Sequence, residues 1–285
     1  MSSKNTFVCL NGRLVPEEDA KVSVFDRGFV YGDGLFTTIR AEDGKPFFLE
    51  QHLKRLQESS DFFGISFPEP LKEKGIIEKL LEINKLQQGH ASVKIILTRG
   101  TVAGLGLPRC QIPTWLITAR PYIPLSREQY EKGWRLIPFC KPRSTPVANH
   151  KTLNYLYNLW ARQWAIDSGA DEAILTDIDG FITETATGSI LIQAGKDWIT
   201  PEAQGILPGI TLKMLRLMWK KNGKRIKECK ITLEEIYKAD QVWILNSMIG
   251  IMPATHIGNY ALSQNFRSLV LKYRGELWEY AKIVS

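Results

Sequence analysis

The chain has 285 residues, of which 44% are hydrophobic and 24% charged, a balance typical of a globular protein with a full core. Its net charge is +7, but the Lys and Arg residues are scattered, and no basic stripe with interleaved aromatic residues indicates nucleic-acid binding. No apolar run reaches the 18 residues of a membrane span, and the N-terminus lacks the apolar core of a signal peptide. We therefore expect a cytoplasmic protein that binds neither nucleic acid nor membrane.

In the first half, alternating apolar residues bounded by turn pairs predict hairpins. One is expected at 6–16 with its turn at Asn11-Gly12, and another at 35–49 with its turn at Asp43-Gly44. Apolar residues near helical spacing predict an amphipathic helix over 49–63 that ends at Gly64. The other expected elements are a strand at 21–25, a tight loop at 31–34, a helix at 70–87, and strands at 91–99 and 114–120.

The second half again mixes strands and helices. The segment 152–167, rich in Leu, Tyr and Trp, predicts a helix closed by Gly169, and Asp179-Gly180 predicts a hairpin turn. Strands are expected at 134–139, 172–176, 181–184, 189–193, 226–230 and 241–245, and a turn at 246–250. Helices are expected at 210–221, 232–237 and 264–281.

Residues 120–131 contain Pro121 and Pro124 and have no core pattern, which is typical of a linker. The chain is therefore interpreted as two α+β domains, at 1–119 and 132–285, with mixed sheets flanked by helices.

Cysteine and histidine show no metal-ligand spacing. The four cysteines, Cys9, Cys110, Cys140 and Cys229, lie far apart and form no CxxC pair. This distribution favours reduced thiols and argues against a metal site. The densest basic cluster, within 220–230, straddles a helix end and a turn, and is interpreted as a solvated face.

Three features point to a cofactor. Lys151 follows a loop of small and Pro residues, Glu184 ends an apolar strand, and Leu207-Pro208-Gly209-Ile210-Thr211 opens a helix. An amine can bind an aldehyde covalently, and an acid can keep a pyridine nitrogen protonated. A helix N-terminus offers unpaired N–H groups to a phosphate. Together these are the parts that hold pyridoxal 5′-phosphate.

Each feature also has an ordinary structural interpretation. Most lysines lie at the surface, and a glutamate at a strand end can point to water. Pro-Gly before a helix is a common helix entry without any ligand. Arg55 can be a solvated helix residue, and Asn246 and Ser247 can form an ordinary turn. The order of these features along the chain is more specific than any one of them.

That order resembles the class IV (fold type IV) pyridoxal-phosphate enzymes, which include branched-chain aminotransferases, D-amino acid aminotransferases and aminodeoxychorismate lyases. The resemblance spans nearly the whole chain. It implies the D-amino acid aminotransferase-like fold, with a small N-terminal and a larger C-terminal domain, the cofactor in the cleft, and a homodimer as the minimal unit. The matching stretches are DRGFVYGDGLFTTIR at 26–40, HLKRL at 52–56, HKTLNYLYN at 150–158, ADEAILTDIDGFITETATGSILI at 170–192, TPEAQGILPGIT at 200–211 and ADQVWILNSMIGIMP at 239–253.

Carried over by position, the resemblance implies a role for each candidate residue. Lys151 resembles the Schiff-base lysine, and Glu184 resembles the partner of the pyridine nitrogen. Tyr155 resembles the residue near the ring hydroxyl, and Leu207 the residue packed on the ring. The implied phosphate ligands are Arg55, Ile210 through its backbone, Thr211 and Ser247. The implied substrate side consists of Tyr31, Thr38, Leu105, Ser247 and Met248, with Thr38 also a catalytic candidate.

The loop 101–107, TVAGLGL, distinguishes the chain from two subfamilies. D-amino acid aminotransferases usually carry Arg-x-His in this loop, and aminodeoxychorismate lyases often carry an arginine there. An uncharged loop suits an apolar side chain better than a second carboxylate. The sequence therefore favours an aminotransferase acting on a branched-chain-like amino acid and a 2-oxo acid.

Other segments keep the alternatives open. FTT at 36–38 and NSMIGIMP at 246–253 look more lyase-like, whereas NYL at 154–156 and the LPGIT turn look more like branched-chain aminotransferases. Ser189 stands where many members of the family have Asn, so the contact that this Asn makes behind the site is not expected to be the same here. Aminodeoxychorismate lyase and D-amino acid aminotransferase remain the alternative activities.

Overall fold

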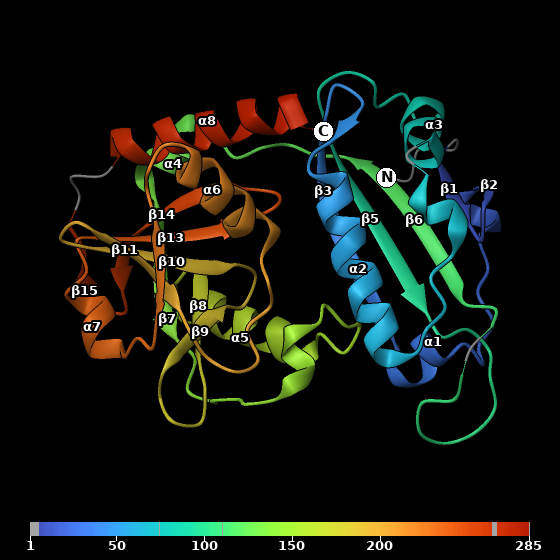
Figure 1. Ribbon diagram of the computed structural model, residues 1–285, viewed down its shortest axis with the longest axis horizontal. Helices are drawn as coiled ribbons and strands as arrows, with labels where there is room; N and C mark the ends of the chain where they lie inside the picture. The colour runs from blue at the N-terminus through green and yellow to red at the C-terminus, as the bar shows by residue number, and fades with distance from the viewer. Residues whose placement is uncertain (1–5, 74, 110, 264–266, 285) are drawn as a thin grey trace. The chain divides into compact units, whose positions relative to one another are not determined.

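The computed structural model describes residues 6–73, 75–109, 111–263 and 267–284 (Figure 1). The chain divides into two compact units. The N-terminal unit comprises Met1–Pro124, His150–Asn154 and Ala281–Ser285, and the C-terminal unit comprises Leu125–Asn149 and Tyr155–Tyr280. Each unit combines a β-sheet with α-helices, so the fold is α+β.

The N-terminal unit is built on a six-stranded sheet of order β2-β1-β6-β5-β3-β4, whose five strand pairs are all antiparallel. Helix α2 packs on β3, and helix α3 packs on β1 and β6 (Figure 1). The core between them consists mainly of Leu and Ile side chains, because alternate residues of each strand face the helices. The elements are β1 (Phe7–Leu10), β2 (Arg13–Pro16), η1 (Glu17–Asp19), α1 (Arg27–Tyr31), β3 (Gly34–Glu42), β4 (Lys45–Pro46), α2 (Leu49–Phe63), η2 (Glu69–Lys72), α3 (Gly75–Ile83), β5 (His90–Thr98) and β6 (Thr114–Pro121).

The C-terminal unit is built on a nine-stranded mixed sheet of order β12-β11-β10-β13-β14-β7-β8-β9, with β15 paired to β14. Helices α4, α5 and α6 pack on β14, β8 and β13 respectively. The elements are α4 (Arg127–Lys132), β7 (Trp134–Pro138), η3 (Pro146–Asn149), α5 (Leu156–Asp167), β8 (Glu172–Thr176), β9 (Ile182–Thr185), β10 (Ser189–Ala194), β11 (Asp197–Pro201), α6 (Ile210–Lys221), β12 (Ile226–Cys229), α7 (Leu233–Tyr237), β13 (Gln241–Asn246), β14 (Gly250–Ile257), β15 (Tyr260–Ala261) and α8 (Arg267–Val284).

Several sequence-based expectations need correction. The apolar alternation at 21–25 forms no strand, and its Val22, Val24 and Phe25 side chains are exposed. The helix expected at 152–167 begins only at Leu156, and the helix expected at 70–87 is a 3-10 turn followed by α3. The strands β11 and β14 were not expected. The first sheet is antiparallel rather than mixed.

Regular structure occupies part of the expected linker 120–131. Strand β6 runs to Pro121, and Ser126 begins α4 with a capping box to Gln129. Tyr130 is buried and donates a hydrogen bond to the Ile249 carbonyl at 2.6 Å. The domain limits 1–119 and 132–285 stay a prediction. The first three residues of the helix expected at 264–281 lie outside the described residues.

In the part of the chain that the structure describes, no helix combines the length and apolar character needed to cross a membrane.

Candidate functional site

Lys151 lies on the N-terminal unit, where its segment is added to strand β3. The Phe36 N–H donates to the Lys151 carbonyl at 2.9 Å, and the Leu153 N–H donates to the Gly34 carbonyl at 2.8 Å. An isolated bridge between Leu35 and Thr152 lies between these two bonds. Lys151 is therefore held by backbone pairing to β3, rather than by the helix that we expected to follow it directly.

The Lys151 ammonium group lies over an aromatic ring. Its Nζ is 4.7 Å from the ring centroid of Phe36, a distance at which a cation is attracted to the π face. The neighbouring His150 is stacked on Phe62 at 4.4 Å, and its Nδ1 is 3.0 Å from Ser59 Oγ on α2. Burial lowers the pKa of His150. The backbone on both sides of Lys151 is thus fixed to the N-terminal unit.

Arg55 belongs to a buried polar group between α2 and β3. Its guanidinium donates to Thr37 Oγ1 at 3.1 Å, and Thr37 Oγ1 lies 2.7 Å from His52 Nδ1. Burial lowers the pKa of His52 well below its ordinary value, and the charges of Arg55 and Lys151 act in the same direction. His52 is therefore neutral at neutral pH. Arg55 is 9% exposed, which is against the solvated-helix interpretation.

The three residues expected on the substrate side of this unit lie in different settings. Thr38 is half-buried on β3 and, by strand alternation, shares a face with Phe36. Tyr31 is 59% exposed, with the Arg27 guanidinium 4.9 Å from its ring centroid. Leu105 is 93% exposed. Their assignment to the substrate stays a prediction.

Glu184 lies on β9 of the C-terminal unit and is 7% exposed. This burial is against the interpretation in which the carboxylate points to water. Its charge affects a neighbour: burial raises the pKa of Tyr157, the Arg143 charge lowers it, and the Glu184 charge raises it. The turn that follows is fixed by Thr185, whose N–H donates to the Gly188 carbonyl at 2.8 Å.

The turn after Glu184 is also held by Tyr155 and by polar residues that the sequence analysis missed, among them the buried Asn158 and Glu172. The Ala186 carbonyl accepts hydrogen bonds from Asn158 Nδ2 at 3.0 Å and from the Tyr155 hydroxyl at 3.1 Å. Thr187 Oγ1 donates to the carboxylate of Glu172. Glu172 is fully buried, and the desolvation raises its pKa, although Arg162 at 3.0 Å opposes this.

Tyr155 is the N-cap residue of α5. Because its hydroxyl has one proton and that proton goes to Ala186, donation to a cofactor oxygen would require the hydroxyl to turn.

The N-terminus of α6 has the character of an anion site. Its N-cap, Gly209, makes no side-chain cap bond, and no acidic residue lies in the first turn. A Cβ on Gly209 would lie 2.3 Å from Ser189 Oγ, so a larger residue here would require the Ser189 side chain to move. Ile210 and Thr211 are buried, and Leu207 is half-buried. The first-turn N–H groups can therefore receive a phosphate without competition from a capping side chain.

Ser247 and Met248 are half-buried and lie in the turn between β13 and β14. Asn246 Oδ1 accepts the N–H groups of Met248 and Ile249, both at 3.0 Å. Asn246 Nδ2 also donates to the Thr187 carbonyl at 3.3 Å, which ties this turn to the one after Glu184. The Met248 N–H, a predicted carboxylate donor, thus has a partner within the turn.

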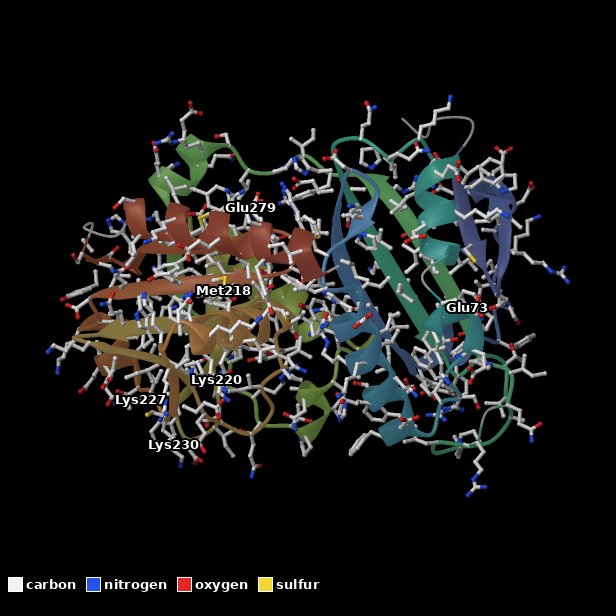
Figure 2. All side chains as sticks on the ribbon, turned by 45° about the horizontal axis from the view of Figure 1, so that its top comes forward. Glu73, Met218, Lys220, Lys227, Lys230 and Glu279 are labelled. Atoms are coloured by element: carbon white, nitrogen blue, oxygen red, sulfur yellow. The ribbon has the colours of Figure 1, made fainter. Side chains whose placement is uncertain are left out.

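The basic cluster within 220–230 lies at the end of α6 and on β12 of the C-terminal unit, where Figure 2 labels Lys220, Lys227 and Lys230. These side chains are exposed, and Lys227 pairs with Asp197 at 2.6 Å. Since β12 is an edge strand, charges there also oppose pairing with another chain. Its position agrees with a solvated face.

Among the described residues, no group of three or more His, Cys, Asp or Glu side chains is placed to hold a metal ion. Cys9, Cys140 and Cys229 are free thiols, and Cys110 lies outside the described residues.

The sequence profile of the family described as Amino-transferase class IV matches residues 34–257. The chain belongs to this class IV aminotransferase family. A branched-chain-amino-acid aminotransferase of Methanocaldococcus jannaschii, itself named only provisionally, is 37% identical over 88% of this chain and 87% of its own length. The aminodeoxychorismate lyase of Bacillus subtilis is 30% identical over 88% of this chain and 86% of its own length.

A solved class IV structure supports the same fold. The branched-chain aminotransferase of the thermophilic archaeon Thermoproteus uzoniensis, determined with norvaline, is 25% identical and superimposes with a TM-score of 0.85. The match covers 97% of this chain and 94% of that one. The chain therefore has the fold type IV architecture of a family that includes aminotransferases and lyases.

Proposed function

We propose that the chain is a pyridoxal-phosphate-dependent aminotransferase that moves an amino group between an apolar, branched-chain-like amino acid and a 2-oxo acid. The preference for an apolar substrate side chain is proposed from the loop 101–107, because this loop contains no ionisable side chain. The arginines behind it, Arg27 and Arg99, are engaged by Asp33 and by backbone carbonyls. A second substrate carboxylate would therefore find no cation in this loop, and leaving it unpaired is costly.

The residues present fit pyridoxal phosphate in both units. The N-terminus of α6, whose N-cap Gly209 makes no side-chain cap bond, offers N–H donors to a phosphate. In the N-terminal unit, Arg55, held by Thr37, supplies a charge suited to a phosphate. When bound, the cofactor supplies a protonated ring that delocalises the electrons of the broken substrate bond.

Each proposed residue has a chemical task. Lys151 would hold the cofactor through its aldehyde, and the freed Nζ amine would take the proton from the substrate α-carbon and pass it on to the cofactor side rather than back to that carbon. Glu184, a buried carboxylate, keeps the ring nitrogen protonated. As the resemblance implies, Leu207 would contact the ring and Tyr155 would serve the ring hydroxyl. Ser247 and Thr211 add hydroxyl groups for the phosphate.

The substrate carboxylate is assigned to the turn at Ser247 and Met248, and Tyr31, Thr38 and Leu105 to the substrate side chain. Because Asn246 Oδ1 already accepts the Met248 N–H, the Ser247 side chain is the stronger candidate in this turn.

Aminodeoxychorismate lyase is the second candidate, favoured by the relative from Bacillus subtilis. The same Lys151 would then protonate the leaving enol, and Thr38 would assist. A D-amino acid aminotransferase is a third candidate, which the absence of Arg-x-His from loop 101–107 disfavours.

A half-reaction screen separates these activities. Purified protein loaded with cofactor is mixed with each L- and D-amino acid, and the absorbance of the bound cofactor is followed. We expect leucine, isoleucine, valine or methionine to react fastest. Pyruvate release from aminodeoxychorismate is measured in parallel. Efficient pyruvate release with negligible reaction of any apolar amino acid would reject the aminotransferase and favour the lyase.

We also infer a homodimer. Helix α5 exposes an apolar stripe at helical spacing, formed by Leu156, Leu159, Trp160 and Trp164. An exposed apolar face of this kind typically marks a protein interface. Sedimentation equilibrium tests this inference: we expect a dimer for the native chain and a weaker dimer for Trp160→Glu. A monomer at micromolar concentration would reject it.

A further inference from the structure

A buried cluster of charges lies against the loop 101–107, and none of its residues has been assigned a role above. It consists of Arg27 on α1, Asp33 before β3, and Arg99 after β5. The side chain of Arg99 is fully buried, and those of Arg27 and Asp33 are 8% and 9% exposed. Buried charges of this kind are costly unless they are paired and hydrogen-bonded.

One carboxylate oxygen joins the two arginines. Asp33 Oδ2 accepts from Arg27 Nε and from Arg99 Nε, both at 2.8 Å. Burial works against ionisation of Asp33, but the hydrogen bonds from Arg99 and Arg27 outweigh it and lower the pKa of this carboxyl. The cluster therefore holds two cations and one anion, which leaves one positive charge for other groups to stabilise.

Backbone carbonyls of the loop accept the remaining donors of Arg27. Its two terminal nitrogens donate to Gly104 O at 2.8 Å and to Gly106 O at 2.7 Å. Both glycines have positive φ, +108° and +79°, a conformation that L side chains rarely adopt. The planar guanidinium can bind two carbonyls two residues apart only because its donors lie in a fixed fork.

Arg99 fixes the C-terminal end of the same loop. Its guanidinium donates to the Pro108 carbonyl at 2.9 Å, and also to the Gly64 and Phe63 carbonyls at the end of α2 at 3.0 and 2.8 Å. The loop is thereby tied to a helix of the core. In contrast, Leu105 at the tip is 93% exposed, so side-chain packing does not hold the loop.

We propose that Arg27, Asp33 and Arg99 form an ion triad that fixes the backbone of loop 101–107, and that Arg27 is a positioning residue for selection of the substrate side chain. The second part rests on the proposed role of this loop in substrate choice. The first part depends only on the contacts of the triad.

The test compares Arg27→Lys and Arg27→Met with Arg13→Lys, a matched change of an exposed arginine on β2. A lysine at position 27 keeps the charge but cannot bind both carbonyls and Asp33. Thermolysin cuts before leucine, so cleavage before Leu105 reports local opening of the loop. We expect both Arg27 variants to be cut about tenfold faster than the native protein, and Arg13→Lys to be cut at the native rate.

The second measurement is the ratio of kcat/KM for leucine to kcat/KM for glutamate, taken at equal cofactor occupancy. A purely structural role would leave this ratio unchanged, whereas a positioning role lowers it at least about threefold. Native cleavage rates in both folded Arg27 variants would overturn the triad. Faster cleavage with an unchanged ratio would keep the triad and overturn its role in substrate choice. Failure of both variants to fold would assign Arg27 to stability alone and overturn the positioning role.

These outcomes are distinct from failure of the proposed function. If the native protein reacts with no amino acid, the aminotransferase is rejected, yet the cleavage measurement still decides whether the triad holds the loop.

Discussion

Thr37→Val is the most direct perturbation of the proposed phosphate ligand Arg55. Valine has nearly the shape of threonine, so packing between α2 and β3 is retained while the hydroxyl is lost. That hydroxyl accepts from Arg55 at 3.1 Å and lies 2.7 Å from His52 Nδ1. The substitution therefore leaves a buried guanidinium donor and a buried ring nitrogen each without one partner.

The expected loss of stability in Thr37→Val follows from these two hydrogen bonds. A hydrogen bond to a charged group contributes about 1.5–3 kcal/mol, and one between neutral groups contributes about 0.5–1.5 kcal/mol. Arg55 has further interactions, so we take the lower half of the combined range and expect Thr37→Val to destabilise the protein by about 2–3 kcal/mol. Because Arg55 loses an orienting contact but keeps its charge, we expect about tenfold weaker binding of pyridoxal phosphate, equivalent to about 1.4 kcal/mol.

Equilibrium dialysis of the cofactor-free protein against pyridoxal phosphate measures the dissociation constant. Thr37→Ser is the matched control, because it keeps the hydroxyl and loses only a methyl group. Arg55→Ala removes the charge altogether and therefore sets the upper limit for the loss of cofactor affinity. We expect this variant to weaken cofactor binding more than it lowers the rate at saturating cofactor. If Thr37→Val and Thr37→Ser bind the cofactor within a factor of two of each other, the hydroxyl does not position Arg55 and the reasoning fails.

Three further predictions concern the proton-carrying residues. Borohydride reduction should fix the cofactor to the peptide that contains Lys151, and Lys151→Ala should lose turnover by several orders of magnitude; a label on any other lysine would reject the assignment. Glu184→Gln should retain cofactor but lose rate equivalent to about 2–4 kcal/mol, and full activity would contradict its role. The pKa of His52 is lowered in the folded protein, so the unfolded chain takes up this proton first as pH falls. Unfolding measurements should therefore show stability lost below about pH 6.5, by up to about 1.4 kcal/mol per pH unit, and His52→Asn should remove most of this slope, whereas an unchanged slope would show that another group is responsible.

Local sequence signals predicted the helices well where periodicity and end signals agree. Helix α2 covers Leu49–Phe63, as its apolar spacing and Gly64 indicated, and α6 covers Ile210–Lys221 after the Pro-Gly entry. The hairpin turns at Asn11-Gly12 and Asp43-Gly44 both have positive φ, as those residue pairs predict. In these elements the signal lies within the segment itself.

The missed elements depend on partners elsewhere in the chain. Strand β14 is buried at nearly every position, so it shows no alternation by which a strand can be recognised. The segment 21–25 does alternate, but no neighbouring strand pairs with it and its valines are exposed. The segment around Lys151 pairs with β3, which lies more than a hundred residues earlier. The sequence predicted a helix directly after Lys151, but not the pairing of its segment with β3.

The segment 26–33 shows that residues of a family motif can have a structural role rather than a catalytic one. Asp26 caps α1 by accepting the Gly28 N–H at 2.8 Å, and it also accepts from Thr98 Oγ1 at 3.0 Å. A Cβ on Gly28 would lie 2.3 Å from Thr98 Cγ2, so glycine is required for this approach.

Arg27 and Asp33 complete the same segment. They join the 26–33 turn to the loop 101–107 through the shared carboxylate and the loop carbonyls. Apart from Tyr31, which is assigned to the substrate side, the contacts described in this stretch are explained by backbone geometry and by one buried ion triad. The residues proposed to do chemistry, Lys151 and Glu184, lie in other segments. We therefore expect the 26–33 segment to act on function through the position of loop 101–107, which the proposed role of that loop links to substrate choice.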